Sequence, residues 1–312
     1  MAAAVVRGDE RIYGCWYPRR EPIDQTSLFE IGSVTKAFTG VLLADMVLAG
    51  EVALEDPLSR YVPRPRPAWR HREPTLLELA THRSGLPNTP GPMKRRELAY
   101  ALGMRGDDPW GRLARTQYER LVAAESPRRA PGGRIRYSSM AVGLLGDALA
   151  ARAGTSYEAL LAERILYPLG MHGTSVQVAP ELEGRVVGHS RRGQPRPPIE
   201  DFMPAAGSLR SSAEDMLRFL SACLQPPAER PGPALSLAQQ PHARVSRRVE
   251  IGLCWMISTR RKHPPVVWHN GGTWGFRSFA AFSPESDTAT VVLSNSVRSV
   301  DRVGFRLMDP RR

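Results

Sequence analysis

Ser33 and Lys36 are the residues of this sequence whose types and spacing best suit covalent chemistry. An apolar run from Val41 to Ala49 follows them without a break, and together these segments predict a helix from about Val34 to Ala49. Residues three apart on a helix share a face, so the Ser33 hydroxyl and the Lys36 amine would lie one turn apart. A serine hydroxyl needs a neighbour to take its proton, and a lysine can do so once burial or nearby cations lower its pKa. The pair therefore predicts a nucleophile beside its base.

Lysine is rare in this chain, which makes the position of Lys36 informative. The sequence holds 43 Lys and Arg residues, of which only Lys36, Lys94 and Lys262 are lysines. Lys36 alone has a serine three residues before it, and an arginine in its place could not act as a base because its guanidinium stays protonated. The alternative is a solvated helix residue after an N-cap serine, and an isolated Ser-x-x-Lys motif does not exclude it.

Composition limits the remaining function classes. The net charge is +12 and the isoelectric point is about 10.3, but the arginines are scattered singly and in pairs, so we expect no nucleic-acid partner. The histidines lack the spacing of metal ligands, which predicts no metal site. The odd, widely spaced cysteines Cys15, Cys223 and Cys254 indicate no disulfide framework. No signal-peptide pattern and no span of membrane length is visible, so we expect a cytoplasmic protein that does not enter a membrane.

Short strands are predicted at both ends of the chain, with helices between them. The expected strands are residues 2–6, 12–16, 251–258, 266–269, 276–282 and 288–294. The expected helices are residues 34–49, 75–81, 93–103, 111–125, 138–153, 156–166, 212–224 and 297–308. This order predicts an α/β fold whose sheet is built from both termini and flanked by helices, with an inserted, mostly helical subdomain. We expect residues 1–55 and 205–312 to form the α/β domain and residues 56–204 the helical subdomain, with the active site between them.

Two further segments carry groups that could complete a site. Tyr137 lies just before a predicted helix, where its hydroxyl could face a cleft; near a lysine its phenol pKa would fall and it could relay a proton. Glycine-rich residues 268–276 join two predicted strands, and backbone N–H groups there could form half of an oxyanion hole. The alternatives are a half-buried tyrosine and a tight glycine turn. No Gly-x-Ser-x-Gly elbow, phosphate-binding loop or dinucleotide fingerprint is present.

Three motifs in order resemble those of the serine β-lactamase and penicillin-binding-protein superfamily: Ser33-Val34-Thr35-Lys36, Tyr137-Ser138-Ser139 and His269-Asn270-Gly271-Gly272. The chain is most similar to the branch of class C β-lactamases and their esterase, D-amino-acid peptidase and transacylase relatives, over about residues 25–295. The resemblance implies a β-lactamase/transpeptidase-like α/β fold with an antiparallel sheet.

The resemblance also implies a mechanism. Ser33 would attack an ester, amide or thioester carbonyl, Lys36 and Tyr137 would carry its proton to the leaving group, and the backbone N–H groups of Ser33 and Gly272 would hold the oxyanion. Ser139, His269, Asn270 and Gly271 complete the expected substrate-binding and oxyanion set. No metal or organic cofactor is implied. The partner would be a small-molecule acyl donor, with an amine or alcohol as acceptor if the acyl group is transferred.

Two positions depart from the pattern of the relatives that bind penicillins. Ser139 stands where those relatives commonly have Asn, and its hydroxyl offers one donor hydrogen instead of an amide's two. His269 stands where they commonly have Lys, and it is only partly charged at neutral pH. Both changes are expected to weaken the binding of an amide flanked by a carboxylate, which disfavours a true β-lactamase or a D-Ala-D-Ala carboxypeptidase.

The sequence therefore predicts a serine hydrolase that forms an acyl-enzyme on Ser33 and cleaves a small ester or amide. The first alternative is a transacylase or off-loading enzyme of a biosynthetic pathway that uses the same acyl-enzyme. The second is a catalytically inactive binding module on the same scaffold. The sequence does not distinguish hydrolysis from transfer, and it leaves the acyl group and the oligomeric state open.

Overall fold

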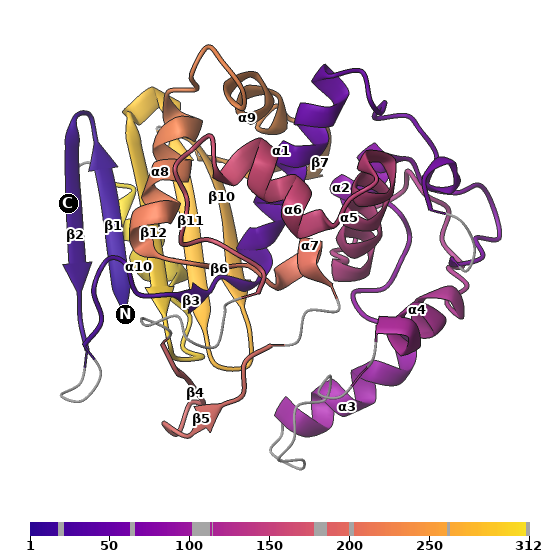
Figure 1. Ribbon diagram of the computed structural model, residues 1–312, viewed down its shortest axis with the longest axis horizontal. Helices are drawn as coiled ribbons and strands as arrows, with labels where there is room; N and C mark the ends of the chain where they lie inside the picture. Colours follow the sequence, from indigo (N-terminus) through magenta and orange to yellow (C-terminus); the bar gives the residue numbers. More distant parts are fainter. Residues whose placement is uncertain are drawn as a thin grey trace.

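The computed structural model describes residues 1–17, 22–62, 66–101, 113, 115–177, 186–199, 203–260 and 263–309. Lys262 and parts of the helices expected at residues 93–103 and 111–125 lie outside these ranges. Within the described residues no helix is long and apolar enough to cross a bilayer. Figure 1 shows a large sheet with helices on both of its faces, and a group of helices beside it.

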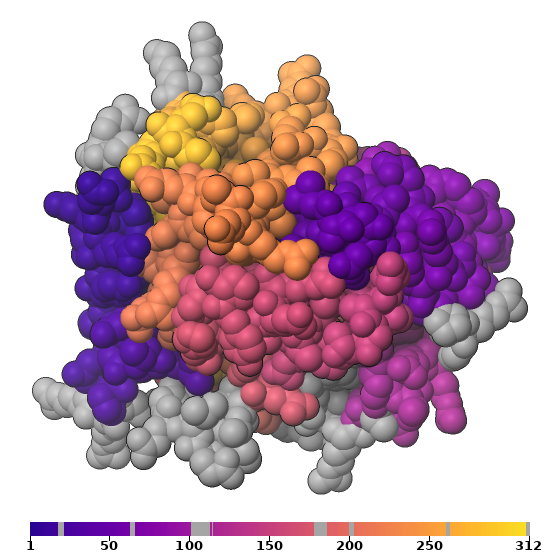
Figure 2. Space-filling model, turned by 45° about the horizontal axis from the view of Figure 1, so that its top comes forward, coloured from indigo at the N-terminus to yellow at the C-terminus, as the bar shows by residue number. Residues whose placement is uncertain are grey.

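An eight-stranded antiparallel sheet dominates the described chain, in the order β2-β1-β12-β11-β10-β9-β8-β7. Its strands are β1 (Ala2–Arg7), β2 (Glu10–Cys15), β7 (Ala243–Ser246), β8 (Val249–Ile251), β9 (Met256–Arg260), β10 (His263–Gly272), β11 (Arg277–Ser283) and β12 (Thr288–Ser294). Pairing of β1 with β12 places Val5 opposite Thr290. The prediction that both termini build one sheet is confirmed, and Figure 2 shows the two ends of the chain close together at one end of the molecule.

The helices of the described chain differ in length and burial. They are α1 (Thr35–Leu48), α2 (Leu76–Ala80), α3 (Gly91–Ala101), α4 (Arg115–Ala123), α5 (Ser139–Ala153), α6 (Tyr157–Leu161), α7 (Pro204–Gly207), α8 (Ala213–Leu224), α9 (Gly232–Ala238) and α10 (Asp301–Leu307). Two-residue strands pair as β3 (Phe29–Glu30) with β6 (Arg210–Ser211) and as β4 (Gly188–His189) with β5 (Pro195–Arg196). Helix α8 packs on one face of the sheet and α10 on the other (Figure 1).

Alternation along β11 divides its side chains between two apolar layers, because successive residues of a strand point to opposite faces. Ala280 and Phe282 belong to the main core, whereas Phe279 and Ala281 pack with α10. Helix α1 lies inside the main core, where every residue from Thr35 to Met46 is buried. A helix that is apolar on all sides is expected to be surrounded by other elements, and α1 contacts α5, α7 and α9. The residues that begin α1 are therefore fixed by the whole core.

The prediction of one continuous strand at residues 251–258 is wrong. Strand β8 ends at Ile251 and β9 begins at Met256, and the turn between them puts Cys254 at φ 61°. The backbone N–H groups of Leu253 and Cys254 donate to the carbonyls of Ala238 and Ala80, outside the sheet. Composition alone favoured a continuous strand because these residues are apolar, but their apolar side chains are buried in this turn against the helices.

Candidate active site

Ser33 and Lys36 lie together at the start of α1. Ser33 belongs to a short 3₁₀ turn, Gly32–Val34, that continues into the helix. The Lys36 Nζ atom lies 2.9 Å from Ser33 Oγ and 2.5 Å from the carbonyl oxygen of Ala206. Lys36 is fully buried, and within the described chain no carboxylate pairs with its amine. The predicted spacing therefore brings a nucleophile and an amine into direct contact.

A glycine immediately before Ser33 makes this turn possible. Gly32 has φ 51°, a conformation that L-residues with a side chain rarely adopt. A Cβ at this position would lie 2.7 Å from the backbone nitrogen of Gly272, which is at the end of β10. Gly271 is equally restricted, since its Cβ would lie 2.1 Å from the carbonyl oxygen of Ile31 and 3.0 Å from the nitrogen of Ser33. These glycines let the backbone of β10 approach the nucleophile.

The remaining residues of the third motif alternate between the faces of β10. His269 is buried on the side of Lys36, and burial and the Lys36 charge lower its pKa to about 3. Its ring is therefore neutral at physiological pH. The Asn270 side chain lies on the opposite face and donates to Asp301 Oδ2 at 3.0 Å, so the structure does not place it in the site, contrary to prediction. Gly272 lines the same cavity as Ser33.

Tyr137 stands at the entrance of α5 with 41% of its surface exposed. The centre of its ring lies 5.0 Å from Lys36 Nζ, and the ring centroid of His269 is 6.3 Å away. The contact with Lys36 is thus made by the face of the ring, and a proton relay through its hydroxyl stays a prediction. Ser139, two residues further along the chain, lines the same cavity as Ser33 and Tyr137.

A cavity of about 370 Å³ lies in front of Ser33. It is large enough for a small organic molecule. Two charged side chains of opposite sign line it, Glu97 from α3 and Arg277 from β11, and Trp274 contributes an aromatic wall. Trp274 packs edge-on against Tyr100 of α3, with the ring centroids 4.7 Å apart. Among the described residues no group of three His, Cys, Asp or Glu side chains could hold a metal ion.

His82 is a residue of the site that the sequence did not indicate. It is buried at φ 56°, its ring centroid lies 4.4 Å from that of Tyr137, and its Nδ1 atom accepts the N–H of Ser138 at 3.3 Å. Its carbonyl accepts the N–H of Arg136 at 2.8 Å. Burial and the nearby Lys36 charge hold the pKa of His82 well below its ordinary value. His82 thus holds the segment around Tyr137 by its ring and by its backbone.

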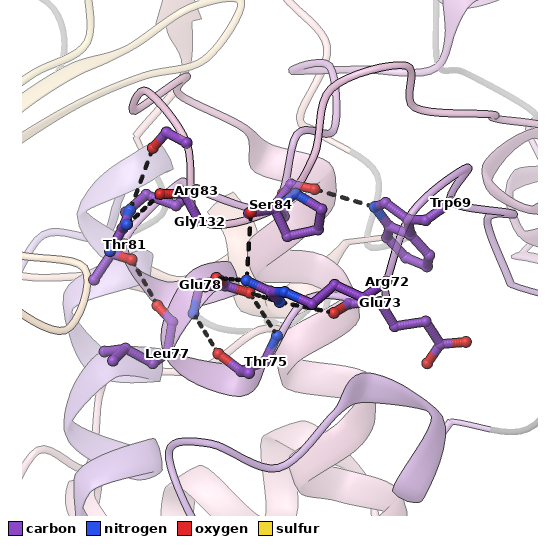
Figure 3. Close-up of polar contacts among 12 residues, drawn as sticks. Trp69, Arg72, Glu73, Thr75, Leu77, Glu78, Thr81, Arg83, Ser84 and Gly132 are labelled. Atoms are coloured by element: carbon purple, nitrogen blue, oxygen red, sulfur yellow. Dashed lines mark hydrogen bonds and ion pairs between the residues drawn. The ribbon is translucent and has the colours of Figure 1, made fainter.

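A polar network fixes the turn that contains His82 (Figure 3). The N-cap Thr75 and Glu78 form the predicted capping box of α2, and Arg72 forms an ion pair with Glu78. Arg83, the residue after His82, donates to the carbonyl of Gly132. A non-glycine residue in the left-handed region persists only where its surroundings hold it there, and these contacts do so. In the sequence, one available signal was the position of His82 just after a capped helix.

Asn88 is a second unpredicted residue of the cavity wall. Its side-chain oxygen accepts the N–H of Ser139 at 3.0 Å, and its carbonyl accepts the N–H of Met140 at 3.1 Å. Asn88 also lines the cavity, so it brings to the cavity wall an amide of the kind that Ser139 lacks.

Comparison with known proteins agrees with this geometry. The family model described as Beta-lactamase matches residues 1–309. The chain belongs to this family. It is 29% identical to the D-alanyl-D-alanine-carboxypeptidase/endopeptidase AmpH of Escherichia coli (strain K12), over 94% of this chain and 78% of that protein. It is 27% identical to a Beta-lactamase of the same organism, over 95% of this chain and 83% of the relative.

Solved structures show the same fold. A class C beta-lactamase superposes with a TM-score of 0.83 at 22% identity, covering 100% of this chain and 90% of the other. A mutant class C beta-lactamase, with one tyrosine replaced by phenylalanine, superposes with a TM-score of 0.82 at 22% identity, covering 98% of this chain and 90% of the other. The predicted superfamily and α/β fold class are confirmed, and the family membership makes this protein an enzyme of the serine hydrolase type.

Proposed function

We propose that this enzyme forms an acyl-enzyme on Ser33 and cleaves a small ester or amide. The observation that carries the proposal is the 2.9 Å contact between Lys36 Nζ and Ser33 Oγ, made by a fully buried amine behind a cavity of about 370 Å³. A base within hydrogen-bond distance of the proton it removes is the geometric requirement for this chemistry.

The reaction has two steps. Ser33 Oγ attacks the carbonyl carbon of the substrate while Lys36, which must be in its neutral form at this point, accepts the hydroxyl proton. The new C–O bond forms as the bond to the leaving alcohol or amine breaks, and the proton held by Lys36 passes to the leaving group. Water then attacks the acyl-enzyme, releasing the acid and restoring the Ser33 hydroxyl. The oxyanion of each tetrahedral intermediate is held by the backbone N–H groups of Ser33 and Gly272, which lie on two elements in close contact.

The activities named for the relatives agree with cleavage of more than one kind of acyl bond. Their names state peptidase and β-lactamase activities, both of which split amide bonds, and an acyl-serine serves amides and esters alike. The neutral His269 removes a cation from the first position of the third motif. This difference supports a substrate other than those of the relatives, and we place small esters and amides first.

The test is the intact mass of the protein after brief incubation with a panel of para-nitrophenyl esters, thioesters, a β-lactam and a peptide ending in D-Ala-D-Ala. We expect a mass increase equal to the acyl group with at least one ester or amide, and peptide mapping should place it on Ser33. Ser33→Ala should carry no adduct, whereas Ser208→Ala, which removes another hydroxyl lining the cavity, should still be labelled. No adduct with any compound, or equal labelling of Ser33→Ala, refutes the proposal. Adding an amine to the same assay separates acyl transfer from hydrolysis.

A further inference from the structure

A second cavity, of about 300 Å³, lies behind the wall of the cavity in front of Ser33. Of the described residues, none lines both cavities. Ile199 separates them: it lines the Ser33 cavity, while its backbone N–H donates to Glu30 at 2.9 Å and its carbonyl accepts a hydrogen bond from Arg210 at 3.0 Å. Glu30 and Arg210 both line the second cavity. The proposed reaction therefore makes no use of this space.

Apolar side chains form most of the wall of the second cavity. The described residues that line it include Leu28, Val186, Val187, Pro198 and Phe276. Leu28, Val186 and Phe276 are buried, whereas Val187 is 42% exposed and so lies at the mouth of the cavity. The volume is at the lower end of the range for ligand cavities, which is roughly 300–1,000 Å³. A narrow apolar space that opens to solvent suits a hydrocarbon chain.

The charged side chains around the second cavity leave an excess positive charge. Among the described residues they are Glu30, Arg196 and Arg210, two cations against one anion. Glu30 and Arg210 are directly opposite each other on β3 and β6, and opposite residues of paired strands share a face. Both side chains are buried, so their charges offset each other. Arg196 is then the cation of the cavity wall that still lacks an anion.

Arg196 belongs to β5, in the β4–β5 hairpin that lies below the sheet in Figure 1, and Tyr100 of α3 holds its side chain in place. Its Nη1 atom donates to the Tyr100 hydroxyl at 3.0 Å, and its Cζ atom lies 4.6 Å from the centre of the Tyr100 ring. Within the described chain, Nε and Nη2 have no hydrogen-bond acceptor and no carboxylate forms an ion pair with Arg196. The Nε and Nη2 N–H groups share one edge of the planar guanidinium, and that edge matches the two oxygens of a carboxylate.

We propose that the second cavity binds a medium-chain carboxylate, with its carboxylate on Arg196 and its hydrocarbon chain among the apolar side chains of the wall. An anion without an apolar body would leave this lining unused, and a neutral chain would leave the half-buried Arg196 without a counter-charge. Both features therefore select the same class of ligand. The site is separate from the acyl-enzyme site, so the inference goes beyond the proposed function and does not depend on acylation of Ser33.

The test is isothermal titration calorimetry of the wild-type protein with octanoate, hexanoate and octanamide at neutral pH. Octanoate should bind in a saturable manner. Two buried methylene groups are worth roughly 10-fold in affinity, so octanoate should bind about 10-fold more tightly than hexanoate. Octanamide keeps the chain but lacks the charge, and it should bind about 10- to 100-fold more weakly than octanoate because a charged hydrogen bond is lost.

Variants then assign the ligand to this cavity. Arg196→Met should reduce the ratio of octanoate to octanamide affinity by about 10- to 100-fold, whereas Arg192→Met, which removes an exposed arginine from the same hairpin, should keep it. Arg277→Met should also keep it, because Arg277 lines the Ser33 cavity. Val187→Trp should abolish octanoate binding by filling the mouth of the cavity. It changes an exposed position, so it decides the question even if Arg196→Met does not fold.

The inference is overturned if octanoate shows no saturable binding, if hexanoate or octanamide binds as tightly as octanoate, or if Arg196→Met keeps the wild-type ratio. An affinity that depends on Arg277 and not on Arg196 overturns it as well, because the ligand would then occupy the Ser33 cavity. An equal loss in Arg192→Met would show only a general attraction of anions to a basic surface, which also overturns it. Failure of the proposed function has a different signature, which is the absence of an acyl adduct on Ser33.

Discussion

Replacing His269 by glutamine should make the stability of the protein less sensitive to acid. Burial and the Lys36 charge lower the pKa of His269 to about 3 in the folded state, against roughly 6.5 for an exposed histidine. The unfolded chain therefore binds a proton below pH 6.5 that the folded chain does not, and the folded state loses stability as the pH falls from about 6.5 towards 3. The loss is about 1.4 kcal/mol per pH unit in this window, which gives about 2 kcal/mol at pH 5.

The measurement is the free energy of unfolding from urea titrations at pH 7.5 and pH 5.0. Between pH 7.5 and pH 5.0 the wild-type protein loses the stability that comes from keeping His269 unprotonated. It also loses stability through other titrating groups, including His82, whose pKa is lowered as well. The difference between the two pH values should be about 2 kcal/mol smaller for His269→Gln than for wild type. His71→Gln is the matched control, because His71 is exposed to solvent and should behave as wild type.

Equal pH dependence in His269→Gln and wild type would refute the reasoning. It would mean that His269 titrates in the folded protein as it does in the unfolded chain, so a positive charge could be present at this position near neutral pH. A changed stability at pH 7.5 alone does not affect the comparison, because the prediction concerns only the difference between the two pH values.

Three further predictions concern the nucleophile and its surroundings. Lys36→Ala should lower the rate of Ser33 acylation by at least about 100-fold, because it removes a positioned base, as followed by intact mass over time. His82→Asn keeps a residue that tolerates the left-handed conformation but removes the ring that packs on Tyr137, so kcat for acylation should fall by about 10-fold with little change in KM. Gly32→Ala should abolish acylation, because the new Cβ would clash with the Gly272 backbone. Gly50→Ala is the control: Gly50 has φ 69° and open space around it, so this variant should lose only about 1 kcal/mol of stability.

Each of these predictions has an outcome that contradicts it. Acylation of Lys36→Ala at near the wild-type rate would show that another group takes the proton. A higher KM at unchanged kcat in His82→Asn would place His82 in substrate binding and not in the positioning of Tyr137. An active Gly32→Ala variant would mean that β10 need not touch the nucleophile turn.

The sequence by itself determined the pairing of Ser33 with Lys36 and most of the helices and strands of this protein. The Ser33 and Lys36 pair follows from a helical spacing that needs no tertiary contact, and the capping box at Thr75 and Glu78 is equally local. The strands of both termini were indicated by short runs of residues that favour β-structure, a property of each run by itself. Local patterns of this kind can be recognised because each depends on residues only a few positions apart.

Only the tertiary structure decided which side chains complete the site. His82, Asn88 and Arg277 come from segments that are distant in the sequence from Ser33, and none of the three was predicted to belong to the site. Asn270 was expected in the site but faces the other side of β10, because strand alternation assigns faces only once the register is known. The sequence predicts one strand over residues 251–258, but the turn at Cys254 packs against the helices and interrupts this strand. Burial and long-range contact set the conformations and charges of these groups, and neither quantity is a property of a short stretch of sequence.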